Sequence, residues 1–170
     1  MNALSPLLDR WRLCAVLASA AMLATAHGFQ TFGGYAPCTL CLRQREVYWT
    51  ALGVGIASMV LVRLPRGARW RQLSGWVLAL IFLVGAGVAA YHAGAEWKLW
   101  PGPQACATAG GGVSAADMDA FLTGEKIRPP ACDEAPWVFA GLSMAGWNVL
   151  ISLALAGFGV LTALRERRKA

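Results

Sequence analysis

The sequence predicts an all-α membrane protein, a four-helix transmembrane bundle with two outward-facing loops that carry cysteines. Of its 170 residues, 57% are hydrophobic and only 14% are charged, against about 25% charged residues in a typical soluble domain. The charges also leave long gaps. Between Arg12 and Arg43 only His27 can ionise near neutral pH, and the intervals 47–62, 72–95 and 135–164 contain no Asp, Glu, Lys or Arg.

About 20 apolar residues of helix cross a bilayer core, so four such intervals predict four spans. We expect a single membrane domain over residues 1–170, with helices at about 13–29, 43–63, 73–93 and 138–164. The first helix has a competing interpretation as a cleaved signal peptide, because Ala24-Thr25-Ala26 could form a small-residue cleavage site.

The basic residues predict the orientation. Ten of the fifteen lie at alternate ends of the apolar intervals: Arg10, Arg12, Arg63, Arg66, Arg69, Arg71, Arg165, Arg167, Arg168 and Lys169. The positive-inside rule then places both termini in the cytoplasm of a bacterial cell, with the chain in the inner membrane. The loops at about 30–42 and 94–137 would be periplasmic, and this distribution argues against a nucleic-acid-binding patch.

The second apolar interval is short, and this affects the position of Arg45. Sixteen residues of helix span about 24 Å, less than a core of about 30 Å. The helix is therefore expected to begin near Cys41 to Arg43, which draws Arg45 to the outer edge of the membrane. On a helix, Arg45 would share a face with Cys41. In the long loop, Ser114 to Asp117 resembles a capping box and predicts a short helix at about 114–123, either on the membrane surface or free of it.

Four of the five cysteines fall in the predicted periplasmic loops: Cys38, Cys41, Cys106 and Cys132. Four cysteines allow three pairings, and adjacency favours Cys38 with Cys41, which leaves Cys106 with Cys132. A two-residue spacing removes little entropy from an unfolded chain, so the first pair suits redox chemistry better than bracing. A helix start and nearby arginines would lower the pKa of a thiol there.

Oxidising a dithiol releases two electrons and two protons, and the sequence has no nucleotide-binding glycine motif and no CxxCH haem site. A quinone dissolved in the membrane is the acceptor that Cys41 and Arg45 would meet, and arginine can donate hydrogen bonds to a quinone carbonyl. The alternatives are a metal- or haem-handling membrane protein with cysteine ligands, and a non-catalytic bundle with braced loops. We predict no bound metal, because the cysteine spacing is unlike a structural zinc site.

The sequence resembles the bacterial disulfide bond formation protein B (DsbB) family over nearly the whole chain. The segments that carry the resemblance are Pro37-Cys-x-x-Cys41 with Arg45, Trp100-Pro-Gly-Pro103 before Cys106, Cys132-Asp-Glu-Ala-Pro-Trp137, and Gly141-Leu-Ser-Met-Ala-Gly-Trp147. The resemblance implies a four-helix protein that binds ubiquinone, or menaquinone under anaerobic growth. It also implies a periplasmic partner, a DsbA-like oxidase with a thioredoxin fold.

The resemblance implies a role for each matching residue. Cys106 would form the mixed disulfide with the partner, Cys132 would pass electrons to Cys38, and Cys41 would contact the quinone. Arg45 would hold the quinone, and His92 is the candidate for the histidine that approaches the quinone in some family members. Its spacing to Cys106 differs from theirs, so a capped interface histidine is the other interpretation.

Overall fold

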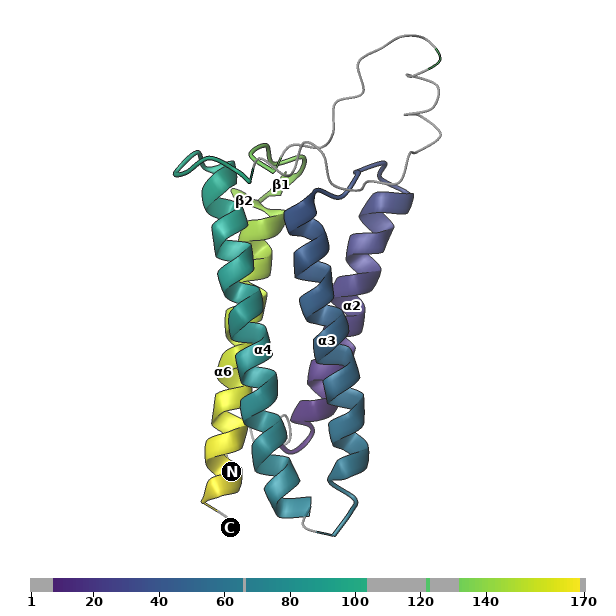
Figure 1. Ribbon diagram of the computed structural model, residues 1–170, viewed down its shortest axis with the longest axis vertical. Coiled ribbons are helices and arrows are strands. Elements are labelled where there is room, and N and C mark those ends of the chain that lie inside the picture. Colours follow the sequence, from purple (N-terminus) through teal and green to yellow (C-terminus); the bar gives the residue numbers. More distant parts are fainter. Residues whose placement is uncertain (1–7, 66, 104–121, 123–131, 169–170) are drawn as a thin grey trace.

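Four long helices run side by side and form the body of the protein (Figure 1). The structure is a computed structural model that describes residues 8–65, 67–103, 122 and 132–168. The helices are α2 (Trp11–Thr31), α3 (Thr39–Leu61), α4 (Gly67–Glu96) and α6 (Met144–Arg167). A small antiparallel hairpin of β1 (Val138–Phe139) and β2 (Leu142–Ser143) precedes α6.

Three of the four helices are long and apolar enough to cross a membrane: Trp11–Thr31, Arg69–Glu96 and Met144–Arg167. Helix α3 is less apolar because Arg43, Arg45 and Glu46 lie in its first two turns. It has 23 residues, which at 1.5 Å per residue make about 34 Å, and it runs alongside the other three as the fourth member of the bundle (Figure 1). The fold is the predicted helical membrane bundle.

Small residues bring α4 and α6 into close contact. A Cβ atom added at Gly75 would lie 2.9 Å from the Cβ of Ala163, and one added at Gly159 would lie 3.0 Å from the Cβ of Ala79. Such close approach of backbones is typical of helix packing in membranes. The aromatic side chains of Trp11, Tyr48 and Phe82 fill the core where α2, α3 and α4 meet.

The starts of α3, α4 and α6 differ from the prediction by several residues, and α4 begins at Gly67 instead of about 73. Helix α3 begins at Thr39, so Cys41 lies inside the helix and not in the loop predicted over 30–42. The predicted helix at 138–164 begins only at Met144, because residues 138–143 form the hairpin instead. Ala140 and Gly141 have φ values of 51° and 80°, as the two central residues of a tight hairpin turn require.

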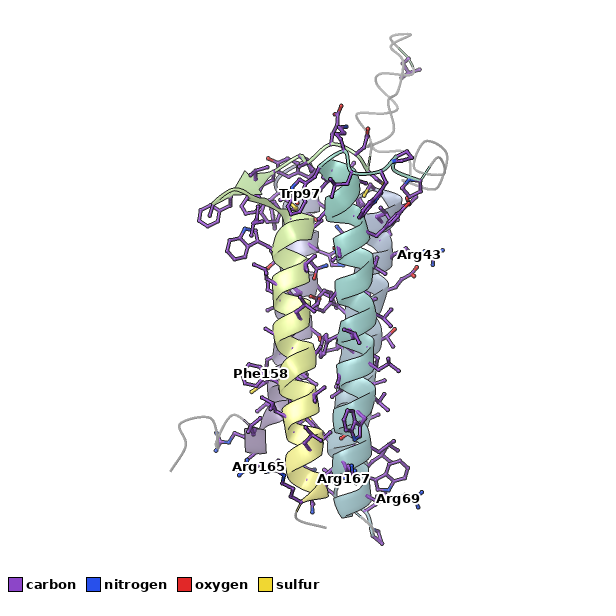
Figure 2. All side chains as sticks on the ribbon, turned by 90° about the vertical axis from the view of Figure 1, so that its left-hand side faces the viewer. Arg43, Arg69, Trp97, Phe158, Arg165 and Arg167 are labelled. Carbon is purple, nitrogen blue, oxygen red and sulfur yellow. The ribbon has the colours of Figure 1, made fainter. Side chains whose placement is uncertain are left out.

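Basic residues at the start of α4 and the end of α6 lie at one end of the bundle. Figure 2 shows Arg69, Arg165 and Arg167 at this end and Trp97 at the other. Arg71 pairs with Glu166 at 2.9 Å and links α4 to α6 there. The described chain both starts and ends at this end, beside the α3–α4 connection (Figure 1). Of the helix expected at 114–123, all but Leu122 lies outside the described residues.

Candidate redox site at the start of α3

The two cysteines of the CxxC segment lie against each other where α3 begins. Cys38 is the N-cap residue of the helix, and its Sγ accepts a hydrogen bond from the backbone N–H of Cys41 at 3.3 Å. The two sulfur atoms are 2.9 Å apart and both thiols are free. A disulfide bond is about 2.05 Å long, so the two sulfur atoms need only a small movement to form one.

The environment of Cys38 favours its protonated form. Its hydrogen bond with the sulfur of Cys41 raises the pKa of the Cys38 thiol above the ordinary value, and burial adds to the effect. The backbone hydrogen bonds that the helix start supplies act in the opposite direction and are weaker. At Cys38 the proton shared with the second sulfur therefore outweighs the effect of the helix start.

Cys132 lies next to the pair on its loop side. The Sγ of Cys132 is within 4.8 Å of the Sγ of Cys38 and 3.6 Å from Oγ1 of Thr39. Cys132 is disulfide-bonded, whereas Cys106, its predicted partner, lies outside the described residues. The Nζ of Lys98 holds this segment by contacts of 2.6 Å and 2.9 Å to the backbone oxygen and Oδ2 of Asp133.

An apolar cavity of about 370 Å³ borders the pair at Cys41. Its polar lining includes three residues predicted from the sequence, namely Cys41, Arg45 and His92. Its wall includes aromatic side chains, and Phe29 packs against Trp137 at 5.3 Å between ring centroids. Pockets that bind small molecules are usually apolar, with a few polar groups, and measure about 300–1,000 Å³.

The two arginines of the segment point to different surroundings. Arg45 lines the cavity and donates hydrogen bonds to Oε1 of Gln30 at 2.6 Å and to the backbone oxygen of Ala26 at 3.0 Å. Arg43 does not line this cavity. Its side chain is 70% exposed and pairs with Glu46 at 2.8 Å. Arg45 is therefore the arginine held in place beside Cys41.

The structure places His92 in direct contact with the cysteine pair. Its Nε2 atom is 3.6 Å from the Sγ of Cys38 and 3.7 Å from Oε1 of Glu96. Its Nδ1 atom is 2.8 Å from Nε2 of Gln44, and Oε1 of Gln44 accepts a hydrogen bond from the amide nitrogen of Asn148.

Gln44, Glu96 and Asn148 were not predicted as site residues. A signal was available for two of them. Asn148 is the only amide side chain in the interval 135–164, and Glu96 ends the charge-free interval that contains His92.

The fold and the site together define a class of protein, a multi-pass helical membrane protein with a dithiol beside a second disulfide and an apolar cavity. Residues 9–162 match the family described as Disulfide bond formation protein DsbB, and the chain belongs to this family. The predicted resemblance is thereby confirmed, and disulfide oxidoreduction is the class of chemistry that fits the site.

Curated relatives cover nearly the full length. The disulfide bond formation protein B of Methylococcus capsulatus is 31% identical over 88% of this chain and 90% of its own length. That of Marinobacter nauticus is 31% identical over 93% of this chain and 94% of its own length. That of Xylella fastidiosa is 29% identical over 99% and 98%. The similarity therefore extends over all four helices and both cysteine-bearing segments.

Proposed function

We propose that this protein is a quinone-dependent thiol oxidase that reoxidises a periplasmic DsbA-like dithiol oxidase. One observation carries the proposal: the Cys38–Cys41 pair lies close to a second redox-capable sulfur at Cys38 and borders an apolar cavity at Cys41. Cys132 is within 4.8 Å of Cys38, and Cys41 lines the cavity. This arrangement suits a relay in which the CxxC pair is the exit of the electron path.

The relay proceeds by thiol–disulfide exchange, in which a thiolate attacks a disulfide sulfur. The partner's thiolate attacks Cys106, which breaks the bond to Cys132 and leaves the electron pair on Cys132. Cys132 then attacks Cys38 of the oxidised pair and releases Cys41 as a thiolate. The partner's second thiolate next breaks the mixed disulfide, which oxidises the partner and releases Cys106 as a thiolate. Cys106 then attacks Cys132, the bond between Cys132 and Cys38 breaks, and Cys38 receives the electron pair. Cys38 and Cys41 are then both reduced, as in this structure.

The cavity residues fit a quinone. Ubiquinone, or menaquinone, would supply a two-electron acceptor that also takes up two protons. Aromatic side chains such as Trp137 and Phe29 would contact a flat ring, and Arg45 would donate hydrogen bonds to a carbonyl oxygen. His92 lines the same cavity, which supports its assignment to quinone binding. Cys41 would face the ring and Cys38 would close the disulfide.

The proposed location is the bacterial inner membrane, with both termini in the cytoplasm. Arg69, Arg165 and Arg167 at one end of the bundle support this orientation (Figure 2), because basic residues favour the cytoplasmic side. The redox site, at the opposite end, would then face the periplasm, where disulfides persist and a soluble oxidase could reach the loop that carries Cys132.

A metal site is the second candidate, because ligand atoms of Cys38, His92 and Cys132 lie within 4.8 Å of one another. A thiolate is the form of cysteine that binds metal, and the sulfur of Cys132 is already in a disulfide. The thiol–disulfide relay needs the same short distances between these residues, and it is compatible with Cys132 being in a disulfide. Metal in stoichiometric amount in purified protein, with its thiols protected from alkylation, would favour the metal site instead.

The test is quinone reduction driven by a reduced DsbA-like oxidase, followed by absorbance in detergent or lipid. We expect quinone loss that matches oxidation of the partner, and none with Cys41→Ser. Thiol trapping should show the Cys106–Cys132 disulfide becoming reduced when quinone is depleted and partner dithiol is supplied. Trapping gels in which both pairs stay unchanged would rule out the relay.

A further inference from the structure

A hydrogen-bond network of buried polar side chains runs from α6 through α3 to His92. Its members are all buried: Gln44, Tyr48, Asn148 and Ser152. Buried polar groups in proteins are nearly always hydrogen-bonded. A hydroxyl group can donate or accept, but an amide has a separate donor and acceptor end, so the orientation of the Asn148 amide determines that of the Gln44 amide.

The donors and acceptors can be followed through this hydrogen-bond network. The hydroxyl groups of Tyr48 and Ser152 donate to Oδ1 of Asn148 at 2.5 Å and 3.1 Å. The amide nitrogen of Asn148 therefore points the other way and donates to Oε1 of Gln44. This leaves Nε2 of Gln44 facing Nδ1 of His92 at 2.8 Å. An amide nitrogen can only donate, so Nδ1 accepts, and the proton of the neutral ring lies on Nε2.

The other side of the ring gives the same answer independently. The Nε2 atom of His92 faces Oε1 of Glu96 at 3.7 Å, and a carboxylate only accepts. The second oxygen of Glu96 accepts from the hydroxyl of Ser143, which also accepts the N–H of Gly146 and caps α6. The Glu96 side chain is 2% exposed. Both neighbours of the ring therefore favour a proton on Nε2.

The remaining charged and titratable groups around the ring do not compete for this position. Cys38 faces Nε2 from the start of α3, and the sulfur of Cys41 is paired with that of Cys38. Arg45 lines the same cavity but is hydrogen-bonded to α2. Cys132, on the loop side, is disulfide-bonded.

We propose that Gln44 and Asn148 are positioning residues that hold His92 as an Nε2–H donor to the sulfur of Cys38. The ring then stabilises the thiolate of Cys38 and does not remove its proton. This inference rests on the proposed function, since Cys38 becomes a thiolate when its bond to Cys132 breaks and the electron pair stays on its sulfur. No proton has to move in that step, and a hydrogen bond from Nε2 favours it.

The first test is a direct measurement of the tautomer. The chain has two histidines, so a His27→Gln background leaves His92 as the only one. Nitrogen-15 NMR of the histidine-labelled reduced protein should show a protonated Nε2 and an unprotonated Nδ1. The opposite tautomer would overturn the proposal, and this readout needs neither quinone nor partner.

The second test moves the proton without touching the cysteines. Gln44→Glu replaces the amide donor with an oxygen that accepts, so the proton should move to Nδ1. Asn148→Asp should turn the Gln44 amide over and have the same effect at a distance. Ser58→Ala is the matched control, because Ser58 is buried on α3 and bonds only to the backbone oxygen of Gly55. In the Ser58→Ala protein, His92 should have the same tautomer as in the parent protein.

The kinetic consequence should follow the tautomer. A hydrogen bond to a charged group contributes about 1.5–3 kcal/mol, so Gln44→Glu and Asn148→Asp should slow exchange between Cys132 and Cys38 by about tenfold or more. If His92 keeps the parent tautomer in the Asn148→Asp protein, the hydrogen-bond network does not orient His92 and the proposal is wrong. If quinone reduction fails in the parent protein while the Nε2–H tautomer is present, the proposed function fails and the hydrogen-bond arrangement stands.

Discussion

Replacing Arg45 with methionine tests the assignment of the cavity to quinone binding. Methionine keeps much of the length of the side chain and removes all five N–H donors of the guanidinium. Two donors are used by Gln30 and Ala26, which leaves three for a ligand. A hydrogen bond from a charged donor contributes about 1.5–3 kcal/mol. Arg45→Met should therefore lower kcat/KM for quinone by about 10- to 150-fold.

Two matched variants separate this effect from others. Arg43→Met removes an equal charge two residues away, outside the cavity, and should leave quinone kinetics within about twofold because exposed ion pairs contribute little. Gln30→Ala removes only one tether of Arg45 to α2 and isolates its contribution. Disulfide exchange with the partner should stay near the parent rate in all three. If Arg45→Met and Arg43→Met lower kcat/KM for quinone equally, general charge and not a held arginine explains the effect, and the reasoning is wrong.

Three further predictions concern Cys41, the packing of α4 against α6, and the contact between Lys98 and Asp133. Cys41→Ser should abolish quinone reduction, and the Cys106–Cys132 disulfide should become reduced in thiol-trapping gels when partner dithiol is supplied, because the electrons can no longer leave; turnover near the parent rate would contradict the relay. Gly75→Ala should lower the free energy of unfolding in detergent by about 1–3 kcal/mol, since the new Cβ meets Ala163 at 2.9 Å. Gly157→Ala, with open space around it, should be neutral or stabilising by up to about 1 kcal/mol; equal effects would contradict the packing. The hydrogen bond from Lys98 lowers the pKa of Asp133 below its ordinary value. The contact between Lys98 and Asp133 should therefore be fully formed above the ordinary pKa of an aspartate and be lost as the pH falls through the lowered pKa. Lys98→Met should then slow exchange at Cys132 throughout the neutral range, measured by stopped flow, and a rate equal to that of the parent would exclude a role for this contact.

The sequence was informative about the helices because a bilayer imposes a simple rule. Charge-free intervals of about 20 residues become membrane helices, and α2, α4 and α6 meet this rule. It was less informative about where helices begin. The apolar residues at 138–143 read as helix, yet the positive φ values of Ala140 and Gly141 turn them into a hairpin. Local conformation of this kind leaves little trace in hydrophobicity.

The same limit applies to the site. Spacing alone pairs Cys38 with Cys41 and places Arg45 on the face of Cys41, because a helix brings residues four apart together. Nothing in the spacing shows that His92 on α4 touches Cys38, or that Gln44 and Asn148 hold it. These contacts depend on how the helices pack, and a single sequence does not record which faces meet.

By itself, the sequence determined the class of protein, the cysteine pair and the arginine beside it, since these follow from composition, hydrophobic length and residues close together in the chain. Only the tertiary structure decided the rest. It placed Cys132 within 4.8 Å of Cys38, put the apolar cavity on the side of Cys41 and set His92 between α3 and Glu96. The physical reason is that contacts between helices distant in sequence arise from side-chain packing and buried hydrogen bonds, and each of these requires a partner from another part of the chain.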